Sequence, residues 1–376
     1  MKEKFSLKDH LFNQKKVKYL ASLLTNADSK FAKEVFVDEV MSRFPELELK
    51  DRIRHITDVL TRHLPADYKK AVEVVIKSLP SPLDPTKSDN DFGDFIFAPY
   101  GEYVAKYGCE EKYLSISYKA LEELTQRFSM EDAIRYFLRA FPKETLLQCR
   151  VWSRHDSYHV RRLVSEGTRP LLPWSGRVPL TSADTLPLLD TLHSDSTRYV
   201  TRSVANHLND IGKREPNVVI DVLKKWQKAG QQDEKELAWM TRHALRTLIK
   251  QGNKDALHLL GYGEEGMVTV NQFGLDFYPN QADQSHTLII DVSIATKNTG
   301  NILIDYSIHF VKKNGQTSPK VFKWKTLATT EGQIIELQKR HTLRGDATTY
   351  KLYSGEHRVV LKINGEELAE ATFIIH

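Results

Sequence analysis

The residues best able to do chemistry are crowded into positions 150–214, which hold nine arginines and one lysine against six acidic residues. A guanidinium can hold a phosphate through two parallel hydrogen bonds, so arginine at this density suits a phosphate-bearing ligand. If the segment is helical, Arg154, Arg161 and Arg162 fall on neighbouring turns and could present a basic stripe to a duplex backbone. The alternative, which charge alone favours, is a solvated helix face with intrahelical ion pairs.

An acid, an arginine and a tryptophan surround a rigid loop in the same region. Glu166, Arg169 and Trp174 lie in or beside residues 167–179, whose three prolines and two glycines exclude a continuous helix. Irregular backbone between helices is a common place for a site. As structure alone, Glu166 could cap a helix or pair with Arg162, and Trp174 could be core. Residue types leave site and scaffold equally open.

Four histidines of this region raise the question of a metal site: His155, His159, His193 and His207. His155 and His159 are four residues apart, but the metalloprotease pattern needs glutamate after the first histidine, and here Asp156 follows it. A third ligand is not identifiable, and structural or surface histidines are commoner. We therefore expect no metal. The two cysteines, Cys109 and Cys149, exclude a disulfide framework and a cysteine-built zinc site.

The elements that position these residues are predicted to be helices from residue 17 to about 260. Apolar residues recur at helical spacing, as at Phe36, Val40 and Phe44. Residues 129–132 and 181–184 each fit a capping box at a helix start. Three glycines are expected helix stops: Gly212, Gly230 and Gly252. Helices of roughly 12–18 residues with short links indicate an all-α HEAT-like repeat solenoid, with a generic helical bundle as the alternative.

After a glycine-rich linker at 261–266 the period of the apolar pattern changes to two, as at Leu288, Ile290 and Val292. Asn314-Gly315 and Asn364-Gly365 predict type I′ hairpin turns. About seven short strands suit an immunoglobulin-like β-sandwich. We therefore predict a helical domain at 1–260, a linker at 261–266, and an all-β immunoglobulin-like sandwich domain at 267–376.

Length and composition agree with this organisation. A chain of 376 residues suggests two or three domains. The formal charge is −1 over residues 264–376 and +6 over the remainder, so the excess positive charge belongs to the helical part. The sequence has no long apolar run that could span a membrane, and charged residues follow Met1–Ser6, so no secretory signal is expected. A cytoplasmic protein is predicted.

Several segments resemble the bacterial DNA alkylation repair glycosylases of AlkC type. The resemblance is carried by Trp152–Asp156, by Arg161–Pro170 running on to Pro173-Trp174, and by Arg202–Asp210. Leu7–Asn13 is similar to the family's opening. The resemblance covers the whole chain, because some members carry an immunoglobulin-like domain after the helices.

The resemblance implies a HEAT-like solenoid whose concave face grips damaged duplex DNA. It implies excision of N3-alkylated bases, chiefly 3-methyladenine and 3-methylcytosine, without metal or cofactor and without the deep pocket of base-flipping glycosylases. One concave face enclosing one duplex needs only a monomer, acting on the bacterial nucleoid. No membrane partner is expected.

Residue by residue, the resemblance implies four catalytic side chains: Glu131, Glu166, Trp174 and Asp210. Asp132 stands where the family pattern has an apolar residue, so Asp132 and Glu131 could exchange roles. The DNA contacts are expected from five arginines: Arg154, Arg161, Arg162, Arg169 and Arg202. Carboxylates and an indole face would stabilise positive charge that develops on the deoxyribose.

Two other functions remain as alternatives. A non-catalytic helical-repeat scaffold could bind DNA or a protein, but carboxylates on its binding face would repel DNA. A carbohydrate glycosidase would need an open, aromatic-lined sugar cleft. In the sandwich, Lys320, Lys323 and Lys325 flank Trp324 and could reach a groove of DNA, or could simply keep an exposed edge strand soluble.

Overall fold

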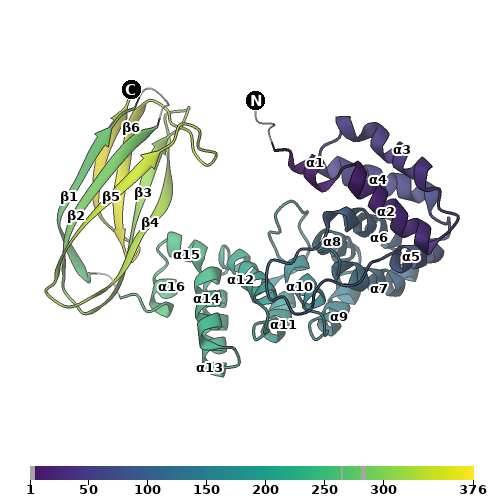
Figure 1. The fold of residues 1–376 in the computed structure, drawn as a ribbon. Coiled ribbons are helices and arrows are strands. Elements are labelled where there is room, and N and C mark those ends of the chain that lie inside the picture. The colour runs from purple at the N-terminus through teal and green to yellow at the C-terminus, as the bar shows by residue number, and fades with distance from the viewer. Residues whose placement is uncertain (1–4, 264–265, 281–284) are drawn as a thin grey trace. The chain divides into compact units, whose positions relative to one another are not determined.

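Helices are followed by strands in the computed structural model, which describes residues 5–263, 266–280 and 285–376 (Figure 1). This order confirms the predicted fold class. The predicted linker lies partly outside the described residues, at 264–265, and so do the first four residues of the chain. No helix in the described ranges is long and apolar enough to cross a membrane.

The helices have the following bounds: α1 Leu7–Leu11, α2 Gln14–Ala27, α3 Lys33–Arg43, α4 Leu49–His63, α5 Tyr68–Lys77, α6 Ala98–Gly108, α7 Leu114–Thr125, α8 Glu131–Ala140, α9 Pro142–Trp152, α10 Tyr158–Gly167, α11 Ser182–Leu192, α12 Arg198–Gly212, α13 Pro216–Ala229, α14 Glu234–Ala244, α15 Arg246–Lys250 and α16 Lys254–Leu259. Short 3₁₀ turns lie at Phe44–Glu46, Phe95–Phe97 and Glu111–Tyr113.

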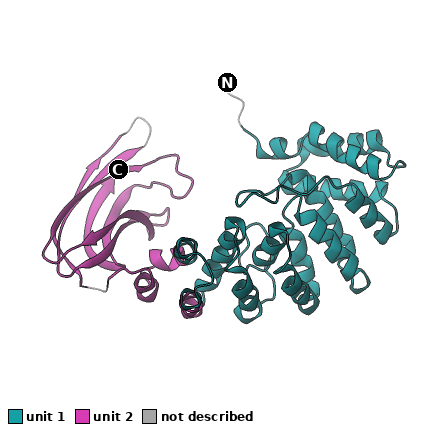
Figure 2. Cartoon of the chain, turned by 60° about the horizontal axis from the view of Figure 1, so that its bottom comes forward, with its two compact units in different colours: residues 1–214, 226–244 teal, residues 215–225, 245–376 magenta. Residues whose placement is uncertain are grey.

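Two compact units make up the chain (Figure 2). The first comprises residues 1–214 and 226–244, and the second comprises residues 215–225 and 245–376. Helices give way to strands between Leu259 and Val268, but the unit that holds the sandwich also takes in α15 and α16. The three-part domain division made from the sequence stays a prediction.

Within the first unit, alternate helices along the chain pack side by side in a row. The contacts run from α4 to α6, α8, α10, α12 and α14 in succession. Apolar side chains of α12 at helical spacing, such as Val200, Val204 and Leu208, are fully buried in this row. The row of paired helices is the arrangement that the repeat rhythm of the sequence predicts.

The two predicted capping boxes had different outcomes. At α11, Thr181 Oγ1 accepts from the Asp184 amide at 3.3 Å and Asp184 Oδ2 accepts from the Thr181 amide at 2.8 Å, as predicted. At α8 the prediction is wrong, because the N-cap residue is Met130 and makes no side-chain cap. The Ser129 hydroxyl instead contacts side chains of two other residues, Glu131 and Arg162. Tertiary partners compete successfully for this hydroxyl.

The β-sandwich of the second unit has a three-stranded sheet, in the order β1-β2-β5, and a four-stranded sheet, in the order β4-β3-β6-β7. All neighbouring strands are antiparallel. The strands are β1 Val268–Tyr278, β2 His286–Thr296, β3 Gly300–Val311, β4 Thr317–Thr329, β5 Ile334–Leu343, β6 Gly355–Ile363 and β7 Glu366–Ile375. Their alternating apolar residues, among them Leu288, Ile290 and Val359, form its buried core.

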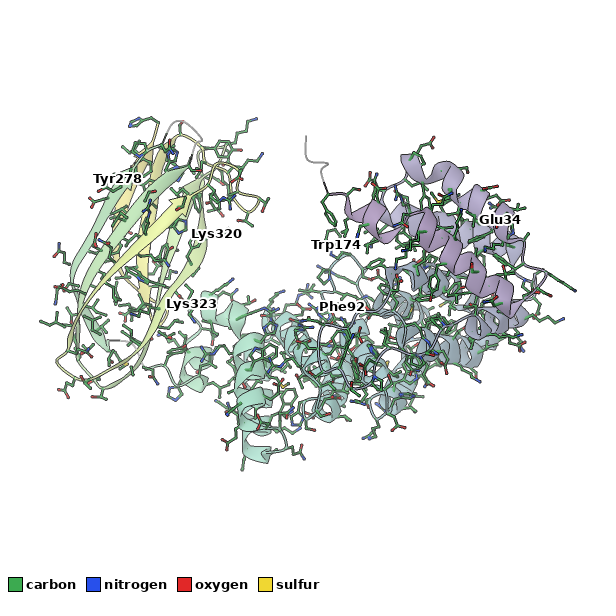
Figure 3. The ribbon with its side chains drawn as sticks, in the orientation of Figure 1. Glu34, Phe92, Trp174, Tyr278, Lys320 and Lys323 are labelled. Atoms are coloured by element: carbon green, nitrogen blue, oxygen red, sulfur yellow. The ribbon has the colours of Figure 1, made fainter. Side chains whose placement is uncertain are left out.

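The two Asn-Gly turns also differ. Asn364 and Gly365 both have positive φ, 50° and 83°, as a type I′ turn between β6 and β7 requires. Between β3 and β4 only Gly315 is left-handed, and the Lys312 amide donates to the Gln316 carbonyl at 2.8 Å. That connection is a wider loop with a glycine in the left-handed conformation. The prediction of a type I′ turn at Asn314-Gly315 was therefore wrong. The lysines around Trp324 lie on β4, an edge strand (Figure 3).

Candidate active site

Three carboxylates come together from three successive members of the helix row. Glu131 begins α8, Glu166 lies in the last turn of α10, and Asp210 lies in the last turn of α12. Gly167 allows α10 to approach α8 closely, because a Cβ there would lie 2.5 Å from Ile134 Cγ2. The helix row therefore gathers acids that are 35 and 44 positions apart in the sequence.

Arg169 joins two of these carboxylates. Its Nε donates to Asp210 Oδ2 at 2.9 Å and its Nη1 donates to Glu166 Oε1 at 2.7 Å. Ser203 Oγ donates to the other Glu166 oxygen at 2.6 Å, and Lys213 Nζ donates to Asp210 Oδ1 at 3.1 Å. Both oxygens of Glu166 and of Asp210 are thus engaged.

Arg162 joins the third carboxylate to the same set. Its Nη2 lies 3.7 Å from Glu166 Oε2 and its Nη1 lies 3.4 Å from Glu131 Oε2. The Ser129 hydroxyl contacts both Glu131 and Arg162. We call the six charged residues of this set the acid–arginine network: Glu131, Arg162, Glu166, Arg169, Asp210 and Lys213.

Access to the carboxylates differs within the network. The side chain of Glu131 is 24% exposed, whereas those of Glu166 and Asp210 are 8% and 2% exposed. Asp132 is exposed, outside the network. Glu131 is therefore the acid that a ligand on the surface reaches first.

The charges of the network hold one another in the ionised form. Burial by itself raises the pKa of Glu166, but Arg162, Arg169 and Ser203 lower it more, so the net pKa lies below its ordinary value. Burial lowers the pKa of Arg162, and the carboxylates of Glu131 and Glu166 outweigh this and raise it. The network holds three carboxylates and three basic side chains, so its formal charges balance.

Two aromatic rings cover Arg162. Its guanidinium carbon lies 4.5 Å from the ring centroid of Tyr199 and 5.6 Å from that of Phe92, within cation–π range. Tyr199 is buried on α12, whereas Phe92 is half exposed on the loop before α6 (Figure 3). Phe92 thus places an accessible apolar ring beside the acids.

Trp174 is placed differently from the acids. Its side chain is 86% exposed, on the loop between α10 and α11 (Figure 3). An indole this exposed is not packed against the buried carboxylates. The structure therefore brings Glu131, Glu166 and Asp210 together but leaves the Trp174 ring free in solvent.

The five arginines expected to contact DNA have different surroundings. Arg162 and Arg169 are buried in the network, and Arg161 is bound to Asp195 at 2.5 Å. Arg202 pairs with Asp89 at 2.6 Å. Arg154 is exposed, where phosphate could reach it without rearrangement. The other four already pair with acidic side chains of the protein, and all five assignments stay predictions.

The histidines of the region are mostly internal. Burial lowers the pKa of His159 and of His207 to about 4, and His193 stacks on Trp226. His155 Nδ1 accepts from the Ser157 amide at 3.0 Å. Among the residues described, no group of three or more histidine, cysteine or acidic side chains is placed to hold a metal ion.

Sequence reasoning missed several members of this region. Tyr199 lies four residues before Ser203, and Ser203 lies seven residues before Asp210, on one face of α12. This helical spacing could have revealed them. Arg135 lies four residues after Glu131 on α8, and the same helical spacing could have revealed it. Phe92 carries no such signal, because only tertiary folding brings its loop to Arg162.

The geometry defines a class: a helical-repeat protein with a buried acid–arginine network, followed by an immunoglobulin-like domain. A family model described as "Uncharacterised protein YhaZ, C-terminal Ig-like domain" matches residues 270–376. Over 364 residues, 95% of this chain and 96% of the relative, the sequence is 34% identical to the uncharacterized protein YhaZ of Bacillus subtilis (strain 168).

Among solved structures, the chain is similar to the alkylpurine DNA glycosylase AlkC of Pseudomonas fluorescens, bound to DNA containing an abasic site analog. The TM-score is 0.86 at 32% identity, and the match covers 99% of this chain and all of that one. The chain belongs to the AlkC-type family of DNA alkylation repair glycosylases. This membership confirms the resemblance seen in the sequence, and with it the helical-repeat and immunoglobulin-like architecture.

Proposed function

We propose that this protein is a monofunctional DNA glycosylase that hydrolyses the N-glycosidic bond of cationic N3-alkylated bases in duplex DNA. The substrates proposed are 3-methyladenine and 3-methylcytosine. Membership of the AlkC-type family and the DNA-bound state of the Pseudomonas relative support DNA as the partner. The observation that carries the proposal is the convergence of Glu131, Glu166 and Asp210 from three helices.

Carboxylates suit this substrate better than a strong general acid does. Alkylation at N3 makes the base cationic, so it leaves as a neutral molecule when it takes the electron pair of the bond to C1′. The barrier then lies in the positive charge that grows on the deoxyribose, which nearby negative charge stabilises. The reaction needs only side chains and water.

The charge count of the network suggests how negative potential becomes available. With Lys213 in place, three carboxylates are balanced by three cations. The Lys213 side chain is 38% exposed and can move to a DNA phosphate. Its departure leaves a net charge of −1 and frees Asp210 Oδ1, while Arg169 still holds Oδ2.

In this mechanism the freed Asp210 oxygen orients a water molecule toward C1′ and accepts its proton as the C–O bond forms. Glu131, the most accessible acid, lies nearest to the arriving sugar. Glu166 stays fixed by Arg169 and Ser203 and adds to the negative potential. Trp174 meets the substrate from the loop side and lays its negative π face against it.

We also propose that the protein acts as a cytoplasmic monomer, since the network and Trp174 all come from one chain. The competing function, a non-catalytic scaffold, draws support from the same network, because paired buried charges can simply connect helices. Activity separates the two functions.

The test is single-turnover release of methylated bases from alkylated duplex DNA by the purified protein and by Asp210→Asn. The variant should lose roughly 10²–10⁴ in rate, the usual scale for acid–base groups. Asp195→Asn is the matched control, because Asp195 is equally buried and also pairs with an arginine, Arg161. It should lose stability but keep its rate. Full activity of Asp210→Asn would remove the proposed role, and an inactive wild-type protein would favour the scaffold.

A further inference from the structure

The loop that carries Trp174 has to present a large apolar ring to solvent. Residues 168–181 connect α10 to α11 without forming a helix or strand. A connection of this length usually either serves a function or lacks a fixed conformation. An indole on a moving loop would have to be ordered at each encounter with DNA, which weakens its contribution.

One buried guanidinium ties the two sides of this loop together. Arg135 of α8 is fully buried and donates four hydrogen bonds to peptide oxygens. Its Nη1 donates to the carbonyls of Gly167 and Arg169, each at 2.8 Å. Its Nε and Nη2 donate to the Gly176 carbonyl at 2.9 and 2.7 Å. Trp174 lies within the stretch of chain that these bonds close.

The charge of Arg135 is held by these peptide carbonyls. Burial lowers its pKa to about 10, so the group is still charged at neutral pH. Burying a charge is costly unless hydrogen bonds satisfy it, and here the satisfying groups all belong to the start and the far side of the loop. The packing of α8 against its neighbouring helices would not by itself require a buried arginine at this position.

The tip of the loop is a strained turn. Trp174 has φ +69°, a left-handed conformation that side chains rarely adopt. Pro173 precedes it, and the Ser175 amide donates to the Leu172 carbonyl at 3.4 Å. Proline followed by a left-handed residue is the pattern of a type II turn, in which glycine is usual at the second of these positions. Lys50 of α4 donates to the Trp174 carbonyl. Strain of this kind persists only where the surroundings hold it.

We propose that Arg135 is a positioning residue that fixes the 168–181 loop in its strained form, so that the Trp174 indole is already in place when DNA binds. The catalytic part of this inference rests on the function proposed above. The structural part, a loop held by Arg135, stands independently of it.

The first experiment measures backbone amide hydrogen exchange of the loop in the wild type and in Arg135→Lys. Lysine keeps the charge, but its single nitrogen has three donors and cannot make the four bonds that Arg135 makes from three separate nitrogens. Exchange across residues 168–181 should rise at least about tenfold if the bonds are lost.

Arg52→Lys is the matched control, because Arg52 is also buried and donates to four backbone carbonyls, those of Leu47, Lys8, Phe12 and Phe44. It should leave loop exchange unchanged. Equal protection in Arg135→Lys and wild type would overturn the proposal, even if the protein were not a glycosylase.

The second experiment is a double-mutant cycle on the single-turnover excision rate at saturating protein. Trp174→Ala should slow excision about 5–30-fold, the worth of one desolvated cation–π contact. Arg135→Lys should slow it by no more than that, and Arg52→Lys should not slow it. In the Trp174→Ala background, Arg135→Lys should have little further effect, because Arg135 acts through the indole. Independent losses that multiply would show that Arg135 acts by another route.

Discussion

Replacing Arg169 by methionine tests whether the buried acids depend on their bridging cation. Methionine fills a similar volume but leaves Glu166 Oε1 and Asp210 Oδ2 without their donor. Breaking a buried ion pair by removing one partner costs about 3–5 kcal/mol. Glu166 keeps Arg162 at 3.7 Å and Asp210 keeps Lys213 at 3.1 Å, so we expect the lower end, about 3 kcal/mol at pH 7.

The loss should depend on pH. Without Arg169, we expect burial to outweigh the remaining contacts with Arg162 and Ser203 and to raise the pKa of Glu166 in the folded variant above its ordinary value of 4.5. The folded variant then binds protons before its unfolded form does, so its free energy of unfolding rises as the pH falls from 7 toward about 4.5. In the wild type the pKa of Glu166 is lowered, so its contribution persists until the pH falls below 4.5. The difference between the two proteins should therefore shrink on acidification.

The assay is urea unfolding followed by helical circular dichroism at several pH values. Arg358→Met is the control, because Arg358 pairs with Glu370 on an exposed face of the sandwich and should cost under about 1 kcal/mol. The triple variant Arg169→Met, Glu166→Gln, Asp210→Asn should recover much of the loss, since no buried charge is left unpaired at those positions. A loss below about 1 kcal/mol at pH 7, or one that is equal at pH 7 and pH 5, would refute the reasoning.

Three further predictions concern stability. Burial lowers the pKa of His207 to about 4 from 6.5, so this imidazole should account for roughly 3 kcal/mol of the stability lost as the pH drops through that window, and His207→Gln should make a pH series of urea midpoints less steep, while the share of His159 remains. Burial raises the pKa of Asp305 to about 6, so Asp305→Asn should stabilise the sandwich by roughly 1–3 kcal/mol at pH 7 and by little at pH 4, a difference that thermal melts would show. Gly167→Ala should destabilise by roughly 1–3 kcal/mol because its Cβ meets Ile134, and in a double-mutant cycle of thermal melts it should cost less in the Ile134→Ala background than in the wild type.

Helix caps and turns that depend on neighbouring residues could be predicted from the sequence. The Thr181 capping box and the Asn364-Gly365 turn depend on residues a few positions apart, and both formed as predicted. The same rules failed at Ser129 and Asn314. At Ser129, a side chain 33 residues away, Arg162, contacts the hydroxyl, and no local pattern records it.

Partners of charged side chains could be predicted only within one helix, as for Glu166 and Arg162, which lie 3.7 Å apart; the partners on other elements could not. Arg161 and Arg162 are adjacent in sequence, yet on α10 they point about 100° apart. One reaches Asp195, and the other reaches Glu131 and Glu166. A count of arginines indicates a basic surface whether the guanidinium groups face solvent or acids. The acids themselves were named from the family's motifs, and their convergence needed the helix row.

The helices α15 and α16 are attached to the sandwich rather than merely preceding it. Leu257 and Tyr262 share a buried apolar cluster with Leu303 of β3, and Gly252 touches Gly365 so closely that neither position has room for a methyl group. A chain cut at the start of β1 would separate Leu257 and Tyr262 from Leu303 and expose their apolar side chains. A test of DNA binding by the sandwich therefore calls for point changes on its surface instead of a shortened protein.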